Sequence, residues 1–240
     1  MSEVHKHAEI ASRTPEFMAG EARKPFGWGD RLFVEWAAVE AMLVAAALPP
    51  GARVLDVGCG VGWTSAFLAA AGYDVLGVDL VPANVEAARA RGSEARFEVA
   101  DMDELALAEP PFDAALLFDA LHHSARQRDA LAGIARHLKP GGVLLLGEPT
   151  WLHRHSPTAK RDAHERGWLE RGLTMRELRR DLRAAGFTDI RRFYQGTRPY
   201  AGPRGFLGEL ARLLAARFVA APQHHLWVSA RAARPSTSTR

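Results

Sequence analysis

Histidine and acidic residues in this 240-residue sequence follow short apolar runs, which is where a parallel sheet places reactive groups. His122 and Glu148 are the two best suited to proton transfer, because each ends such a run with a titratable side chain. His122 could act as a base or could only order its loop. Glu148 could orient a substrate hydroxyl or amine, accept its proton, or serve as a structural carboxylate. These two residues are the predicted catalytic candidates.

A glycine-rich run offers a place for a cofactor. Residues 56–62 read Asp-Val-Gly-Cys-Gly-Val-Gly and follow the apolar pair Val54-Leu55. Glycine allows a positive φ and lets a ligand lie against the main chain. A dinucleotide-binding turn, G-x-G-x-x-G, would need a glycine at position 63, where this chain has tryptophan. The run therefore predicts a nucleoside-containing cofactor and disfavours a nicotinamide-dependent oxidoreductase.

The same run resembles motif I of class I S-adenosylmethionine (SAM) dependent methyltransferases, D/E-x-G-x-G-x-G. In that family the glycine turn lies against the methionine part of SAM, and the acid orders the loop and the ammonium group. Residues 112–123 resemble the fourth strand and following loop of the ubiquinone/menaquinone-biosynthesis type of small-molecule methyltransferase. Residues 138–142, Leu-Lys-Pro-Gly-Gly, resemble the turn before that family's fifth strand. The resemblance covers about residues 50–150.

The resemblance implies a series of cofactor contacts. Asp79 ends the second predicted strand, where a carboxylate can accept both ribose hydroxyls. Asp101 and Met102 suit the adenine ring, although one of the two acids that follow could replace Asp101. The main chain at 117–118 would receive the ammonium group. The predicted cofactor-binding residues are Asp56, Gly58, Cys59, Gly60, Gly62, Asp79, Leu80, Asp101, Met102, Leu117 and Phe118.

Alternating strand and helix patterns predict the elements that position these residues. Strands are expected at 53–57, 74–78, 95–99, 113–118 and 143–147, and helices at about 63–71, 82–91 and 126–138. This alternation indicates an α/β fold with a mostly parallel sheet and helices on both faces.

The C-terminal part breaks the alternation. Thr174 and Glu177 form a capping-box pattern that opens a helix closed by Gly186, and strands are expected at 187–194 and 224–231. The closeness of the last strand to the chain end suggests an edge position. The resemblance instead implies a Rossmann-like seven-stranded sheet in the order 3-2-1-4-5-7-6, with the last strand antiparallel.

Two segments are predicted to cover the site. Residues 1–48 are expected to form an N-terminal helical lid, with a helix from about 30 to 48. The methyltransferase domain is expected at 49–232, with a helical insertion at about 196–222 and a disordered tail at 233–240. The apolar face of the insertion could pack on the core, close as a lid, form a homodimer or touch a membrane. The predicted substrate-binding residues are Trp28, Tyr194, Arg198 and Tyr200.

Composition narrows the partners. Residues 151–240 hold more than half of the 31 Lys and Arg but a quarter of the 28 Asp and Glu, which favours an anionic partner. No nucleic-acid signature and no apolar stretch of roughly 20 residues occurs, so neither nucleic acid nor a transmembrane segment is expected. The single Cys59 suits a cytoplasmic location. His153 and His155 lack an acidic or cysteine partner at ligand spacing, so no metal is predicted.

Together these features predict an enzyme that moves a methyl group from SAM to an oxygen, nitrogen or carbon nucleophile of a small molecule. An anionic or aromatic metabolite is the expected class of acceptor. The reaction is an in-line displacement, for which the protein must align nucleophile, methyl and sulfur. The alternative is a SAM-binding protein that does not methylate, either a partner subunit or a SAM-assisted cyclase.

Overall fold

The computed structural model describes residues 3–26, 31–193, 207 and 225–234. Four of the predicted substrate contacts, Trp28, Tyr194, Arg198 and Tyr200, lie outside the described residues. The same holds for the predicted insertion at 196–222, apart from one residue, and for the tail from 235 onward.

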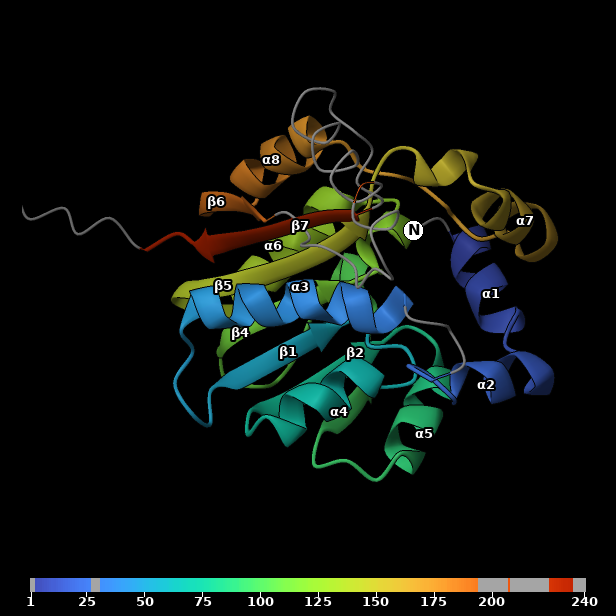
Figure 1. Ribbon diagram of the computed structural model, residues 1–240, viewed down its shortest axis with the longest axis horizontal. Coiled ribbons are helices and arrows are strands. Elements are labelled where there is room, and N and C mark those ends of the chain that lie inside the picture. The colour runs from blue at the N-terminus through green and yellow to red at the C-terminus, as the bar shows by residue number, and fades with distance from the viewer. Residues whose placement is uncertain (1–2, 27–30, 194–206, 208–224, 235–240) are drawn as a thin grey trace, which may run out of the picture.

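The described strands form one seven-stranded sheet in the order β3-β2-β1-β4-β5-β7-β6 (Figure 1). The first five strands are parallel, and β7 is antiparallel to both β5 and β6. The order implied by the resemblance is therefore confirmed. The strands are β1 (Arg53–Val57), β2 (Asp74–Asp79), β3 (Arg96–Val99), β4 (Phe112–Phe118), β5 (Leu138–Pro149), β6 (Phe187–Phe193) and β7 (His225–Ala232).

The edge position suggested for the last strand is wrong. β7 pairs with β5 from Val143 to Pro149 and with β6 on its other side, so β6 lies at the edge. The burial of Leu226, Trp227 and Val228 agrees with this inner position. Closeness to the chain end does not decide the place of a strand, because a buried strand needs hydrogen-bonding neighbours on both sides.

Helices cover both faces of the sheet, as predicted (Figure 1). Alternate strand residues face opposite sides. Val54, Leu116 and Leu145 pack with α3 and α4 on one side, whereas Leu55 and Leu117 pack with α6 and α8 on the other. The helices are α1 (Glu3–Ala11), α2 (Pro15–Glu21), α3 (Arg31–Ala46), α4 (Trp63–Ala70), α5 (Pro82–Ala90), α6 (Gln127–His137), α7 (Pro157–Arg166) and α8 (Met175–Ala184).

Local capping explains where several helices begin. The capping box of Thr174 and Glu177 is present at the start of α8, as predicted. The side chain of Ser156 caps α7, accepting a hydrogen bond from the Ala159 N–H at 3.1 Å, and Pro157 occupies the first turn. The helix α7 was not predicted from the sequence. None of the described helices is long and apolar enough to span a bilayer.

The short helices α1, α2 and α7 gather at the end of the sheet toward which the arrows of β1 and β2 point (Figure 1). Parallel strands bring their carboxyl ends, and the loops that follow them, to this same edge. The fold therefore places a helical cover over the edge that carries the predicted site.

Candidate active site

A cavity of about 330 Å³ lies at this edge, within the size range typical of small-molecule sites. Residues of α1, α2 and α7 form part of its wall, together with the loops after β1, β2, β3 and β4. The predicted site residues that line it are Gly58, Cys59, Gly60, Asp79, Leu80, Met102, Phe118 and His122. The predicted residues Asp56, Gly62, Asp101, Leu117 and Glu148 do not line it.

The three glycines of the turn each have a positive φ, of 73° at Gly58, 53° at Gly60 and 74° at Gly62. A Cβ on Gly58 would lie 2.5 Å from the Cβ of Ala120, and one on Gly62 would lie 2.7 Å from the Cβ of Ala88. A Cβ on Gly60 would meet no atom of the described part of the chain within 4 Å. Gly58 and Gly62 therefore permit close packing, whereas Gly60 leaves the main chain open to the cavity.

Asp79 ties the glycine turn to β2. Its Oδ2 accepts a hydrogen bond from the Gly60 N–H at 2.8 Å, and its Oδ1 accepts from the Val81 N–H at 2.9 Å and from Asn84 Nδ2 at 3.0 Å. A carboxylate offers about four lone-pair positions, so about one remains for a further donor. Asp79 thus shapes the turn and also faces the cavity.

Asp56 lies behind the turn. Its Oδ2 accepts hydrogen bonds from the hydroxyls of Thr64 and Ser65, both at 2.6 Å, and this joins β1 to the first turn of α4. Burial raises the pKa of Asp56 to about 6; the two hydroxyls act in the opposite direction, and the charge of Asp79 adds to the rise. Because Asp56 does not reach the cavity wall, its position fits ordering of the loop rather than contact with a ligand.

Of the predicted cofactor residues after β3 and at the end of β4, some face the cavity and others do not. Met102 faces the cavity, whereas Asp101 forms an ion pair with Lys6 of α1 at 2.6 Å and caps the short turn that follows. The side chain of Leu117 lies in the core, and Phe118 faces the cavity with its ring edge-to-face against Trp63 at 5.5 Å.

Glu148 lies beneath the loop after β4 and not in the cavity. Its fully buried carboxylate accepts hydrogen bonds from the N–H groups of Ala120, Leu121 and His122, at 2.9, 2.7 and 3.1 Å. It also accepts from His122 Nδ1 at 2.9 Å. The predicted direct contact between Glu148 and substrate does not fit this placement, because these four donors surround the carboxylate. Glu148 fits the structural alternative, because it holds the loop after β4 and the ring of His122.

His122 carries a perturbed pKa. Burial alone would lower it, but the hydrogen bond and charge of Glu148, together with the charges of Asp119 and Glu170, raise the pKa of His122 to about 9. Because an ionised carboxylate only accepts hydrogen bonds, Nδ1 is the donor to Glu148, and Nε2 lies 3.7 Å from Glu170 Oε2. At neutral pH the imidazole is therefore predominantly a cation held in one orientation.

Comparison with known proteins agrees with this architecture. Residues 55–146 match the family model described as "Methyltransferase domain". The crystal structure of an S-adenosylmethionine dependent methyltransferase from Mesorhizobium loti superposes with a TM-score of 0.62 at 25% identity, covering 82% of this chain and 97% of that one. A ubiquinone biosynthesis O-methyltransferase of Xanthomonas campestris is 33% identical over 150 residues, 60% of this chain and 59% of the relative.

Residues 55–146 form a class I S-adenosylmethionine-dependent methyltransferase domain.

A relative with a different activity also matches. It is an S-adenosyl-L-methionine-dependent Diels-Alderase of Talaromyces variabilis, 34% identical over 166 residues, which are 60% of this chain and 56% of that protein. The chain thus spans less than two thirds of the length of either curated relative.

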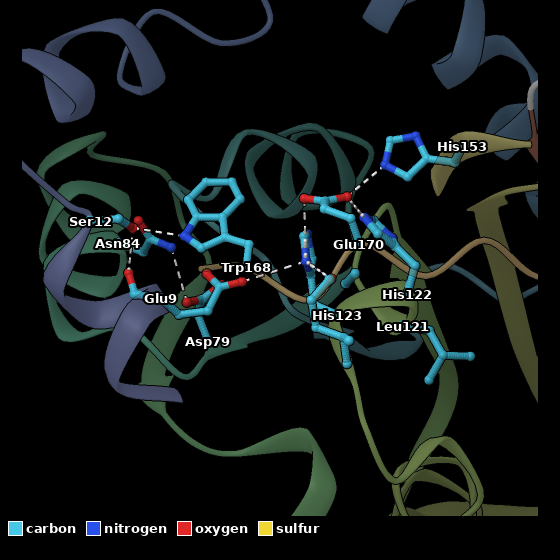
Figure 2. A network of polar contacts seen from close by, with 12 residues as sticks. Glu9, Ser12, Asp79, Asn84, Leu121, His122, His123, His153, Trp168 and Glu170 are labelled. Atoms are coloured by element: carbon cyan, nitrogen blue, oxygen red, sulfur yellow. Dashed lines mark hydrogen bonds and ion pairs between the residues drawn. The ribbon is translucent and has the colours of Figure 1, made fainter. Parts of the chain in front are cut away.

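Segments outside residues 55–146 also bring polar residues to the cavity. We call His122, His123, His153, Glu170 and Glu9 the His–Glu cluster; Figure 2 shows the three imidazoles around Glu170. Glu170 Oε2 lies 2.6 Å from His153 Nε2, and its Oε1 lies 3.9 Å from His123 Nδ1. Glu9 Oε1 lies 3.5 Å from the same nitrogen of His123. Three of these five residues, Glu9, His153 and Glu170, lie outside residues 55–146, which match the family model.

The charges of the cluster are coupled. Burial, with the charge of His122, lowers the pKa of His123 against the pull of Glu9 and Glu170. Burial would raise the pKa of Glu170, but the hydrogen bond from His153 and the charges of the histidines lower it. Glu9 and Glu170 were not predicted from the sequence, because no fixed spacing links them to the histidines.

An aromatic clamp holds α1 and α2 against the segment after α7. The guanidinium of Arg13 lies over the rings of Phe17 and Trp168, at 4.9 and 4.6 Å, and Arg166 approaches the same two rings at 5.2 and 5.3 Å. The Trp168 indole N–H donates to Ser12 Oγ at 2.9 Å. Phe17, Trp168 and both arginines also line the cavity.

Proposed function

We propose that this chain is an SAM-dependent methyltransferase that acts on a small molecule. The glycine turn, the carboxylate of Asp79 and the imidazole of His122 line one cavity, and this arrangement carries the proposal. When bound, SAM supplies an electrophilic methyl group on a sulfonium. The open main chain at Gly60 fits the methionine part, Asp79 and Leu80 fit the ribose, and Met102 fits the adenine ring.

The remaining predicted cofactor residues either form other parts of the cavity wall or hold the glycine turn in shape. Gly58, Cys59 and Phe118 form wall of the same cavity, whereas Asp56 and Gly62 hold the shape of the turn from behind. The predicted roles of Asp101 at adenine and of the main chain at 117–118 at the ammonium group remain predictions.

We further propose that His122 is the catalytic residue and that Glu148 positions it. As an imidazolium at neutral pH, His122 is suited to hold an acceptor that is already ionised, such as a phenolate or carboxylate, in line with the methyl group. Arg13, Arg161 and Trp168 line the same cavity. Positive charge beside an aromatic wall supports an anionic or aromatic metabolite as the acceptor.

The first test is calorimetric titration of the purified chain with the demethylated product S-adenosylhomocysteine (SAH). We expect saturable binding in the micromolar range. Replacing Gly58 by Ala should weaken binding by about 10-fold to 100-fold, because the new Cβ meets Ala120 at a positive φ. Gly72→Ala is the matched control, since Gly72 has a φ of 88° but nothing within 4 Å of its Cβ position. Absence of heat in the wild-type titration would refute the proposal.

A second candidate function follows from the similarity to an S-adenosyl-L-methionine-dependent Diels-Alderase. In that case the chain would bind SAM without transferring its methyl group, as a cyclase or a partner subunit. An assay with labelled methyl groups and pooled metabolites distinguishes the two. Transfer of label supports the methyltransferase, whereas SAH binding without any transfer supports the second candidate.

The other expectations about this chain stay predictions. These are the cytoplasmic location, the open question of a homodimer and the absence of a nucleic-acid partner.

A further inference from the structure

The His–Glu cluster contains more ligand-type atoms than proton transfer requires. His122, His123 and Glu170 each offer one ligand atom, and these atoms lie within 4.8 Å of one another. Ligands bound to one tetrahedral zinc ion at about 2.1 Å stand about 3.4 Å apart. His122 Nε2 and Glu170 Oε2 are already 3.7 Å apart, so small side-chain movements would bring this pair to ligand distance.

The two adjacent histidines are held as metal-binding histidines usually are. A metal-ligating imidazole commonly donates its other N–H to a carboxylate or a backbone carbonyl. His122 Nδ1 lies 2.9 Å from Glu148, and His123 Nδ1 lies 2.9 Å from the carbonyl oxygen of Leu169. In each contact Nδ1 is the donor, which leaves Nε2 to bind a metal once its proton is lost. In His122 this nitrogen is directed at Glu170. In His123 it is Nδ1 that lies 3.9 Å from Glu170 Oε1, so the ring would have to turn for Nε2 to join the set.

Two further groups surround this set. Glu9 is 6% exposed, and among the described residues its Oε1 has no hydrogen-bond partner, although it lies 3.5 Å from His123 Nδ1. His153 Nε2 contacts Glu170 Oε2 at 2.6 Å, so it lies next to the same carboxylate (Figure 2). A divalent cation bound here would face the carboxylates of Glu9, Glu148 and Glu170, of which Glu9 is also paired with Arg13 at 3.0 Å.

We propose that His122, His123 and Glu170 bind a divalent transition-metal ion of the zinc class, with one coordination position open to the cavity. Two imidazoles and one carboxylate suit zinc, cobalt or iron better than magnesium or calcium, which prefer oxygen ligands. No metal was predicted from the sequence, because no acidic residue stands at ligand spacing from His153. The fold supplies that partner as Glu170, 17 residues away.

The open position would receive an oxygen or nitrogen of the methyl acceptor; this part rests on the proposed function. All three ligands line the cavity that also contains the glycine turn. The ion would replace the proton on His122 Nε2 and provide the positive charge that the imidazolium otherwise provides. Metal binding itself does not depend on methyl transfer, so it can be tested separately.

The test uses the full chain after treatment with a chelator and titration with Co²⁺, whose visible spectrum reports coordination by nitrogen and oxygen. We expect saturable binding of one Co²⁺ that Zn²⁺ displaces and excess Mg²⁺ does not. His122→Ala and Glu170→Gln should each weaken Co²⁺ binding at least tenfold. Glu148→Gln should weaken it by about 10-fold to 100-fold, because Glu148 orients His122 without touching the ion.

His164→Ala is the matched control, since His164 is an exposed histidine on α7, and its Co²⁺ affinity should equal that of the wild type. Each variant is also titrated with SAH to show that the fold persists. A missing Co²⁺ spectrum, or one unchanged in His122→Ala and Glu170→Gln, overturns the proposal. Co²⁺ binding without SAH binding would refute the proposed function and leave the metal site standing.

Discussion

The two sides of the cavity are built in different ways. The cofactor side comes from short loops after β1, β2, β3 and β4, within the contiguous residues 55–146 that match the family model. The acceptor side draws Glu9, His153 and Glu170 from segments outside that match. Contacts on the first side follow from local turns that recur in many proteins. The second side depends on how three separate segments dock, which is where members of one fold differ in substrate.

The cofactor side also contains a group buried at a cost to stability. In the native state Asp56 has a pKa of about 6, against an ordinary value of 3.8, so between these values the folded chain binds more protons than the unfolded chain. The contribution of Asp56 to the free energy of unfolding is therefore greatest below about pH 4. This contribution falls as the pH rises through about 6, by about 3 kcal/mol at most.

Of the substitutions that separate the two sides of the cavity, removal of the Asp56 carboxylate should have the largest effect on stability. Asp56→Asn keeps an oxygen that can accept from Thr64 and Ser65 but removes the titration. Urea unfolding at several pH values should show that the difference in unfolding free energy between variant and wild type grows in favour of the variant from about pH 4 to pH 7. Parallel pH profiles for the two proteins would show that Asp56 is not buried as an acid.

The acceptor side should respond to loss of the aromatic clamp. Arg13→Leu removes the guanidinium from between Phe17 and Trp168 and leaves Glu9 without the ion pair at 3.0 Å. We expect the opening free energy of α1 and α2, measured by hydrogen exchange, to fall by about 1–2 kcal/mol.

The strands of the cofactor side should keep their protection in Arg13→Leu, and SAH affinity should stay unchanged. Arg179→Leu, an exposed arginine on α8, is the control and should change neither region. Equal loss of protection in α1 and β4 would mean that the two sides of the cavity unfold together. The two sides would then differ in how their sequences build them but not in stability.

The same contrast explains what could be predicted from the sequence. The glycine turn, Asp79 and the capping box at Thr174 are local patterns, and the structure contains each of them at the expected position. The sheet order was available through the resemblance. Periodicity predicted most helices and strands between residues 53 and 193 to within a few residues.

Burial and docking could not be predicted in this way. Glu148 was expected near substrate because it ends a strand, but three backbone N–H groups of the β4 loop enclose its carboxylate. Glu170 carries no local signal, since its partners His122 and His153 are separated from it by 48 and 17 residues and meet it only through the fold. Residue spacing identifies ligands that lie on one helix or loop, but it does not identify a site whose residues come from several elements.

The smallest expected effect concerns the contact between the two sides at Lys6. Its ammonium group forms an ion pair with Asp101 at 2.6 Å, and the hydrogen bond to Asp101 raises the pKa of Lys6 against the effect of burial. This stabilisation is present at neutral pH and is lost only as pH rises past the ordinary Lys value of 10.5.

Lys6→Met should lower the opening free energy of α1 by less than about 1 kcal/mol, and the difference should shrink in high salt, because the pair lies near the surface. Hydrogen exchange of α1 at low and high ionic strength measures it, with Arg13→Leu as the reference. If Lys6→Met loosens α1 more than Arg13→Leu does, the helical cover is anchored mainly to the cofactor side through Asp101. In that case the acceptor side could not vary independently of the cofactor side, because a change in its docking would alter the end of β3.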